Sequence, residues 1–185
     1  PRRTLETKRP IHIPNLSNSS VTDAAAVRAA WALVMAKYSE SEDVTFGMVS
    51  SGRQAPVRGI DRIPGATIAT VPVRVHVNKN VSVSQYLQTT QDEARKMVQY
   101  EHYGIQNIAK TSADAQEACD FTSLFVIQPF TPTSSVSDGP DAILQPLENN
   151  EGPSHMSGFF SYPLVAQCQI SGNEPNIHFT YDETV

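Results

Sequence analysis

The stretch Asp43–Val77, DVTFGMVSSGRQAPVRGIDRIPGATIATVPVRVHV, decides the fold because it carries two strand patterns on either side of a long loop. Apolar residues take every second position in both patterns, as Val44, Phe46 and Met48 and then as Val71, Val73, Val75 and Val77. A period of two is typical of a strand that buries one of its faces. The sequence therefore predicts two strands joined by a loop.

The loop between these strands covers about residues 50–67. Ser50-Ser51-Gly52 ends the first pattern, and glycines and prolines as far as Gly65 interrupt any regular continuation. Long loops between strands are usually functional. In the second strand, Pro72 has no amide hydrogen to give to a ladder, so we expect this strand at a sheet edge or a bulge.

Length and composition favour one globular domain, residues 1–185, with a cytoplasmic location. The net charge of -5 argues against a nucleic-acid partner, which would require a basic face. No apolar run approaches the ~20 residues that span a bilayer, and the first residues lack the apolar core of a signal peptide. We therefore expect neither nucleic acid nor membrane as a partner.

The cysteines and histidines give no pattern of a reactive or metal site. Cys119 and Cys168 are far apart and outside any CxxC spacing, which favours two buried, reduced thiols. The five histidines are isolated from one another, so we expect no metal site. Ser50-Ser51-Gly52 lacks the GxSxG elbow of a serine nucleophile.

Two amphipathic helices are predicted on either side of the strand pair. Residues 18–23 offer several N-caps for the first helix, whose core face is expected to hold Val27, Trp31, Val34 and Tyr38. Ser82 or Ser84 caps the second, with an apolar stripe of Val83, Leu87, Thr90, Ala94 and Met97 and a polar face rich in Gln, Asp, Glu, Arg and Lys.

The remaining segments complete an α/β sandwich with a mixed sheet. Residues 1–14 suit an edge strand, and Gly104 is expected to end the second helical region before a short turn and a polar stretch at 111–117. Residues 121–128 form an apolar run typical of a strand buried on both faces. After a Pro-rich polar excursion at about 129–158, apolar positions from Phe160 to Ile170 and from Ile177 to Tyr181 predict an antiparallel hairpin.

Three motifs in this order resemble the second half of the condensation domains of nonribosomal peptide synthetases, especially the fungal type. FG, SGR, PVRGI and IPGATIATVPVRV resemble the region around the fifth core motif, YEHYGIQNIA at 100–109 the sixth, and ACDFTSLFVIQP at 118–129 the seventh. Ala69 stands where bacterial members often have Asn, and Ala66 where many fungal members have Pro. These departures concern the subtype more than the family.

The resemblance implies one lobe of a chloramphenicol-acetyltransferase-like fold. The loop at 50–67 would be the floor of a substrate tunnel, and the excursion at 129–158 a latch that crosses to the other lobe. The residues implied at the tunnel floor and lobe interface are Ser51, Gly52, Arg53, Gly65 and Thr70. The catalytic HHxxxDG motif of the family is not in this chain, so no catalytic residue is expected here.

The implied reaction joins a thioester donor and an amine acceptor through an amide bond. Both would be presented on the phosphopantetheine of carrier proteins, with no cofactor bound directly by this chain. The implied partners are an N-terminal condensation lobe and the donor and acceptor carrier proteins. Three alternatives stay open: a non-catalytic module that binds carrier proteins, a terminal cyclising condensation domain, and an acyl-CoA-dependent acyltransferase of the same fold.

Arg53 has two interpretations. It is either a loop arginine in water or a guanidinium that pairs with the Asp of HHxxxDG across the lobe interface.

Overall fold

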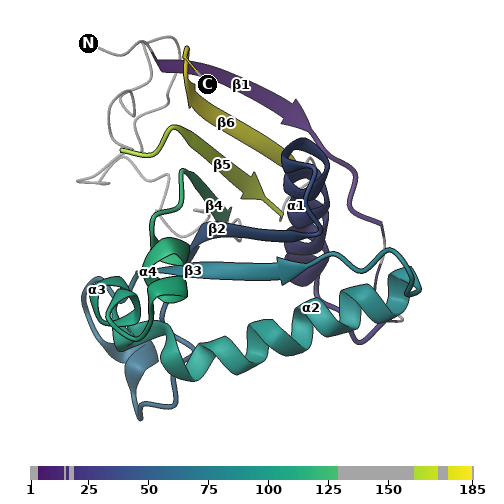
Figure 1. Cartoon of the computed structure of the whole chain (residues 1–185). Coiled ribbons are helices and arrows are strands. Elements are labelled where there is room, and N and C mark those ends of the chain that lie inside the picture. The colour runs from purple at the N-terminus through teal and green to yellow at the C-terminus, as the bar shows by residue number, and fades with distance from the viewer. Residues whose placement is uncertain (1–3, 15, 17–18, 129–160, 171–174, 185) are drawn as a thin grey trace, which may run out of the picture.

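The computed structural model describes residues 4–14, 16, 19–128, 161–170 and 175–184. Six strands form one mixed sheet with the order β1-β6-β5-β4-β2-β3 (Figure 1). The strands are β1 Thr4–Pro10, β2 Asp43–Ser50, β3 Ala69–His76, β4 Ser123–Gln128, β5 Leu164–Gln169 and β6 Asn176–Asp182. The latch-like excursion predicted at 129–158 lies outside the described residues.

Strand directions give the sheet a parallel centre and antiparallel margins. β4 runs parallel to β2 and to β5, whereas β2–β3, β5–β6 and β1–β6 are antiparallel pairs. In the β2–β3 pair, Pro72 lies opposite Gly47, and β3 is an edge strand, as its proline predicted. The edge position of β1 and the antiparallel β5–β6 pair are also confirmed.

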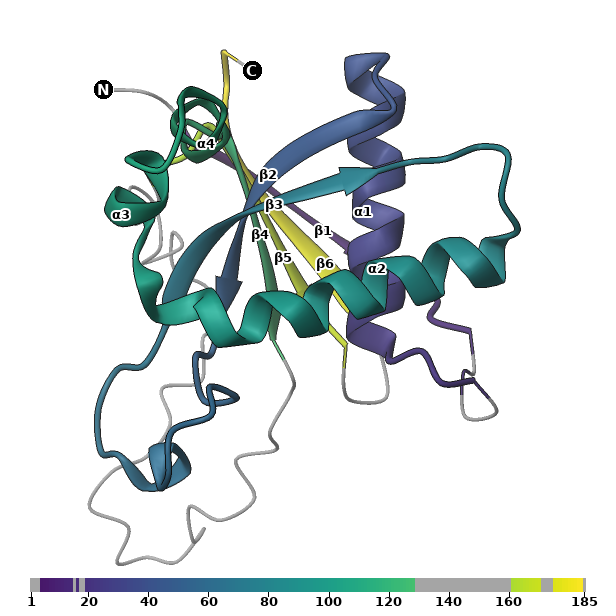
Figure 2. The ribbon, with the colours of Figure 1, turned by 60° about the horizontal axis from the view of Figure 1, so that its bottom comes forward.

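Helices α1 (Asp23–Ser39) and α2 (Val83–Met97) pack against each other over one face of the sheet, with α2 running across α1 in Figure 2. Trp31 of α1 stacks on Phe125 of β4 with ring centroids 5.3 Å apart, and Phe46 of β2 meets Phe125 edge-on at 6.2 Å. Tyr86 of α2 donates its hydroxyl hydrogen to the Ala29 carbonyl at 3.0 Å. The prediction that Trp31 belongs to the core is confirmed.

Two short helices, α3 (Ile105–Ala109) and α4 (Ala113–Cys119), contact β3, and α4 also contacts β2. The ring of Phe121 fills the space that a side chain at Gly47 would occupy. Gly104 ends the 3₁₀ helix η2 (Val98–Tyr103) with a φ of 87°, as its position predicted. Helical segments therefore cover both faces of the sheet near β2 and β3, which is the α/β sandwich expected.

The helix periods were predicted correctly, but the buried faces were partly wrong. Tyr38 is 86% exposed, Val83 is 75% exposed and Val34 is 44% exposed. The face of α1 that meets the sheet is built on Ala25, Ala29, Trp31 and Ala32, because small side chains let the helix approach closely. In α2, Gln91 was assigned to the water-facing side but is buried.

Other predicted boundaries also need correction. The polar stretch 111–117 contains most of helix α4, in whose first turn the Ala115 amide donates to the Ser112 hydroxyl. β4 begins at Ser123, and Phe121 stacks instead on Tyr162, with centroids 5.3 Å apart, on the face of the sheet away from α1. Cys168 lies in the core as a small hydrophobe, as predicted.

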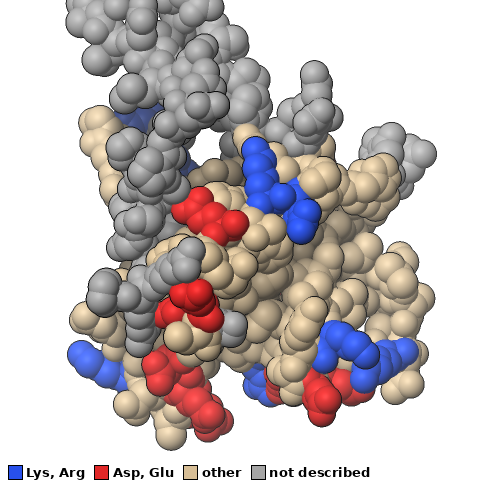
Figure 3. Space-filling model, turned by 90° about the horizontal axis from the view of Figure 1, so that it is seen from above, with Lys and Arg blue, Asp and Glu red and all other residues tan. Residues whose placement is uncertain are grey.

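On one face of the described surface, the charges lie in small groups. Seen from above, basic and acidic side chains form separate clusters rather than one continuous basic face (Figure 3). Among the described residues, no helix has the length and apolar character needed to cross a membrane.

Candidate functional site

The loop after β2 starts with a tight, glycine-dependent turn. The Ser50 hydroxyl accepts a hydrogen bond from the Gly52 amide at 3.3 Å, and the Ser51 hydroxyl accepts one from the Arg53 amide at 3.4 Å. Gly52 has a φ of 65°, in the left-handed region that glycine tolerates without strain. The chain then leaves the body of the sheet through the short 3₁₀ helix η1 (Ile60–Arg62), which projects away from it (Figure 2).

Arg53 holds the far side of this loop. Its Nη1 donates to the carbonyls of Ile60 and Ile63 at 3.1 and 3.3 Å, and its Nη2 donates to the Gly65 carbonyl at 3.0 Å. One guanidinium therefore fixes both ends of η1 and the glycine that follows it. Its pairing with a carboxylate of another lobe stays a prediction.

Gly52 also joins the loop to the sixth motif. The His102 ring in η2 lies 2.7 Å, through Nε2, from the Gly52 carbonyl. A carbonyl oxygen only accepts, so Nε2 carries the hydrogen. A methyl group at Gly52 would collide with the Thr67 carbonyl and approach His102 Cε1 to 2.6 Å. His102 lies in the YEHYGIQNIA segment that resembles the sixth motif, and in the sequence it is one of five isolated histidines.

The structure brings four of the five predicted site residues together. Ser51 accepts a hydrogen bond through its carbonyl from the Thr67 hydroxyl at 2.7 Å, while Gly52, Arg53 and Gly65 are joined by the contacts given above. Thr70 instead lies in β3, opposite Val49 of β2. Hydrogen bonds therefore hold the loop residues of this cluster together, whereas Thr70 belongs to β3, the strand that follows the loop.

A cavity of about 440 Å³ lies beside this loop, and we name it the strand-end cavity. It is bounded by the start of α1, the end of α2, η2 and the carboxyl ends of the parallel strands, where open α/β sheets commonly bind ligands. Its walls include Arg28, Met48, Gln91, Glu101, Ile127 and Ile170.

Two charged groups of the strand-end cavity have unsatisfied polar atoms. Arg28 Nε and Glu101 Oε2 are both buried without a hydrogen-bond partner among the described residues, and Glu101 is only 8% exposed. Burial lowers the pKa of Arg28, and the negative charge of Glu101 acts in the opposite direction. No pattern in the sequence selected Arg28, because a single arginine on a helix normally faces water.

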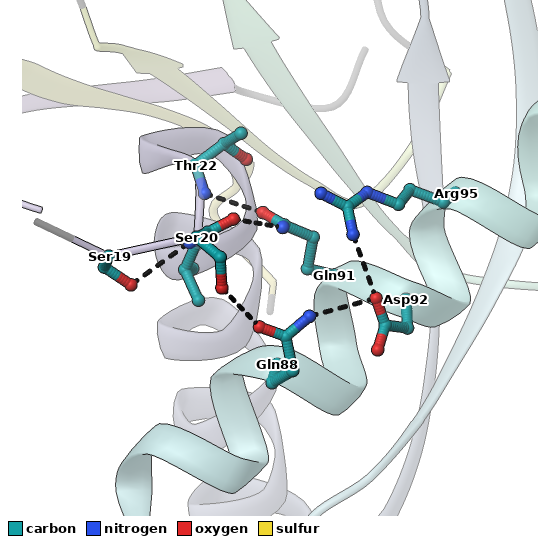
Figure 4. A network of polar contacts seen from close by, with 8 residues as sticks. Ser19, Ser20, Thr22, Gln88, Gln91, Asp92 and Arg95 are labelled. Carbon is teal, nitrogen blue, oxygen red and sulfur yellow. Dashed lines mark hydrogen bonds and ion pairs between the residues drawn. The ribbon is translucent and has the colours of Figure 1, made fainter. Parts of the chain in front are cut away.

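Gln91 forms another wall of the cavity, and both its side-chain oxygen and its side-chain nitrogen are hydrogen-bonded. Figure 4 shows its side chain reaching from α2 to the segment before α1, where it accepts from the Thr22 amide at 2.6 Å and donates to the Ser20 carbonyl at 2.5 Å. Gln88 extends the network by accepting from the Ser20 hydroxyl at 2.7 Å and donating to Asp92 at 3.0 Å. Arg95 also donates to Asp92, at 3.1 Å.

The arrangement can brace and orient a bound molecule, but it contains no assembled catalytic group. Among the described residues, no group of three or more His, Cys, Asp or Glu side chains is placed to hold a metal ion. Burial raises the pKa of the Cys168 thiol to about 11 and also raises that of Cys119, so neither is an activated nucleophile.

Comparison with known sequences identifies relatives along nearly the whole chain. The condensation domain family matches residues 15–185. Nonribosomal peptide synthetase ungA of Aspergillus violaceofuscus is 39% identical over 170 residues, which cover 89% of this chain and 2% of that protein. N-benzoylphenylalaninol synthetase apmA of Penicillium brevicompactum is 38% identical over 168 residues, covering 90% of this chain and 7% of its own length. This chain therefore corresponds to a small part of either relative.

Solved structures share the fold. A crystal structure described as CT has a TM-score of 0.73 and 22% identity, with 98% of this chain aligned to 40% of that one. The EpoB cyclization-docking bidomain of a nonribosomal peptide synthetase from Sorangium cellulosum has a TM-score of 0.67 and 11% identity, with coverage of 98% and 37%. On the family match and these fungal sequence relatives, the chain belongs to the condensation domain family.

Proposed function

We propose that this chain forms one lobe of a condensation domain that joins a carrier-bound thioester to a carrier-bound amine. The observation that carries the proposal is the contact between Gly52 and His102, which joins the loop of the fifth motif to the sixth motif beside the strand-end cavity. Because this sequence contains no HHxxxDG motif, the lobe would position substrate while the other lobe supplies the HHxxxDG histidine.

Exposed apolar residues on the loop support an interface with a second lobe. Val57, Ile63 and Ile68 are all exposed, and Ile68 is 70% exposed. Apolar side chains gathered on one projecting loop are typical of a surface that meets a partner. The partners proposed are an N-terminal condensation lobe and the donor and acceptor carrier proteins, whose phosphopantetheine arms would present the reactants.

Arg53 is proposed to link the two lobes. A guanidinium has five N–H donors, and three contacts to loop carbonyls leave Nε–H and one Nη2–H without a partner among the described residues. Those two donors suffice for a carboxylate such as the Asp of HHxxxDG. Arg53 would then act as a positioning residue that transmits the loop geometry to the catalytic motif.

The test uses the complete two-lobe domain with loaded donor and acceptor carrier proteins. The domain should form the amide product, and this chain alone should not exceed a protein-free control. If the complete domain binds the carriers without forming product, the non-catalytic module is the better description.

Arg53→Ala is expected to lower the condensation rate and the thermal stability, because breaking such a pair costs about 3–5 kcal/mol when buried and about 0–1 when exposed. Arg53→Lys keeps the charge but loses the planar fork, so it should restore the rate only in part. Arg58→Ala, in the same loop and exposed, is the matched control. A rate for Arg53→Ala equal to that of the parent would remove the interface role.

A further inference from the structure

We propose that the strand-end cavity binds an amide group of the substrate, with Glu101 accepting its N–H and Arg28 donating to its carbonyl. The proposal rests on the proposed function, because it assumes that a carrier-bound substrate reaches this lobe. It assigns specificity to two residues outside the loop cluster.

The first step is the contrast between the walls of the cavity. Gln91 is buried with both ends of its side-chain amide bonded to the backbone of the segment before α1. Glu101 and Arg28 line the same cavity, yet Oε2 and Nε are buried and unpaired. A buried polar atom without a partner destabilises the folded protein, and more so when it is charged. Such atoms are expected where a ligand or ordered water completes the bonding.

The second step is the chemistry of the missing partner. One unpaired acceptor and one unpaired donor are complementary to a group that both donates and accepts. A ligand carboxylate would suit Arg28 but would be repelled by Glu101, and an ammonium would meet the reverse problem. A free amino acid carries both charges, but the carboxyl group of a carrier-bound substrate is a thioester. A neutral secondary amide satisfies both atoms without an added charge.

The third step is the setting of the two groups. Met48, Val71, Ile127 and Ile170 contribute apolar side chains to the cavity, beside polar ones such as Gln54, so apolar groups that flank an amide would find apolar contacts there. The volume of about 440 Å³ is enough for an aminoacyl unit. Two parts of a carrier-bound substrate contain such an amide: the peptide backbone of the donor and the pantetheine arm.

The experiment measures binding in the complete condensation domain by NMR, using the Nε–Hε signal of Arg28. N-acetyl-L-alanine N-methylamide represents the peptide source, and pantetheine represents the arm. A saturable shift of the Arg28 signal with either probe supports the site, and the probe with the larger shift at equal concentration identifies the source. No shift with either probe at tens of millimolar overturns it. The experiment measures probe binding and not amide product. A negative result would therefore overturn the amide-binding site without overturning the proposed condensation function.

Variants separate a binding role from a structural one. The double substitution Arg28→Met/Glu101→Met removes both charges and their unbonded atoms with similar volume, so the unfolding temperature should be unchanged or higher. Its probe affinity, measured by saturation-transfer NMR on the ligand, should fall at least tenfold. Lys96→Met, exposed on α2 and outside the cavity lining, should keep the affinity within about twofold. If the double variant binds the probe like the parent, the assignment is wrong.

Glu101→Gln provides a second, nearly isosteric variant. It retains the shape of the side chain but removes the negative charge that helps offset the burial of Arg28. We expect weaker binding of the N-methylamide probe in a folded protein. If Glu101→Gln fails to fold and the parent itself binds no probe, Arg28 and Glu101 have a structural role only.

Discussion

Three glycines of the loop differ in what a methyl group would meet. Gly52 has a φ of 65° and is enclosed by Thr67 and His102, whereas Gly59 has a φ of 79° but open space around it. Gly65 has open space and no such backbone restriction. The three positions therefore separate steric contact from backbone strain.

Alanine at these three positions should destabilise the chain in the order Gly52, Gly59, Gly65. Gly59→Ala should cost about 1–2 kcal/mol through its left-handed backbone alone, and Gly65→Ala should stay within about 0.5. Gly52→Ala adds the collision with the Thr67 carbonyl and should cost more than either. Thermal unfolding measures the series. Equal effects at Gly52 and Gly59 would show that the loop relaxes around Gly52.

Cys168 should make the protein less stable at alkaline pH. Burial raises its pKa from an ordinary value of 9.0 to about 11 in the folded chain. Its contribution is therefore fully present below pH 9 and is lost as the pH rises from 9 to about 11, because the unfolded thiol ionises first. Unfolding of Cys168→Ala, followed across that range, should lose less stability than the parent. Parallel curves for the two proteins would contradict this.

Residue types in the loop were predictable, but their partners were not. The sequence selected Gly52 and Arg53 by their motif, and the structure places both in one braced cluster. The partners of Arg53 are backbone carbonyls of Ile60, Ile63 and Gly65. Every residue has a carbonyl, so sequence carries no signal for which ones a guanidinium will meet.

At the scale of the element, α2 is fastened to α1 through Gln91. Gln91→Ala should destabilise the chain by about 1–3 kcal/mol, because it leaves the Thr22 amide and the Ser20 carbonyl without their partner. Gln85→Ala, on the exposed side of the same helix, is the control and should stay within about 0.5. Denaturant unfolding measures both. A similar loss for the two variants would indicate helix propensity as the cause.

The buried face was harder to predict from sequence for the helices than for the strands. Alternation fixed which side of β2 and β3 is buried, because a strand has only two faces. A helix presents its residues in all directions, so the face depends on the neighbour it meets. Alanines let α1 lie close to the sheet, and Gln91 is buried because the backbone before α1 offers both a donor and an acceptor.

At the scale of the whole molecule, the loop at 51–68 should be protected by a second lobe. Val57, Ile63 and Ile68 are exposed in this chain. Amide hydrogen exchange of the loop should therefore be slower in the complete domain than in this chain alone, while exchange in the central strands stays similar. The exposed side of α1 around Tyr38 is an internal comparison. Equal exchange of the loop in both proteins would place the lobe interface elsewhere.

The antiparallel pairing of β1 with β6 determines when the sheet is completed during synthesis. Thr4 lies opposite Asp182, and β6 is the neighbour of β1 in the described sheet. At ribosomal speeds of about 5–20 residues per second, β1 therefore waits on the order of ten seconds or more before its partner emerges. Its sequence, TLETKRP, suits this interval, because charged residues and a proline on an unpaired strand oppose association between nascent chains.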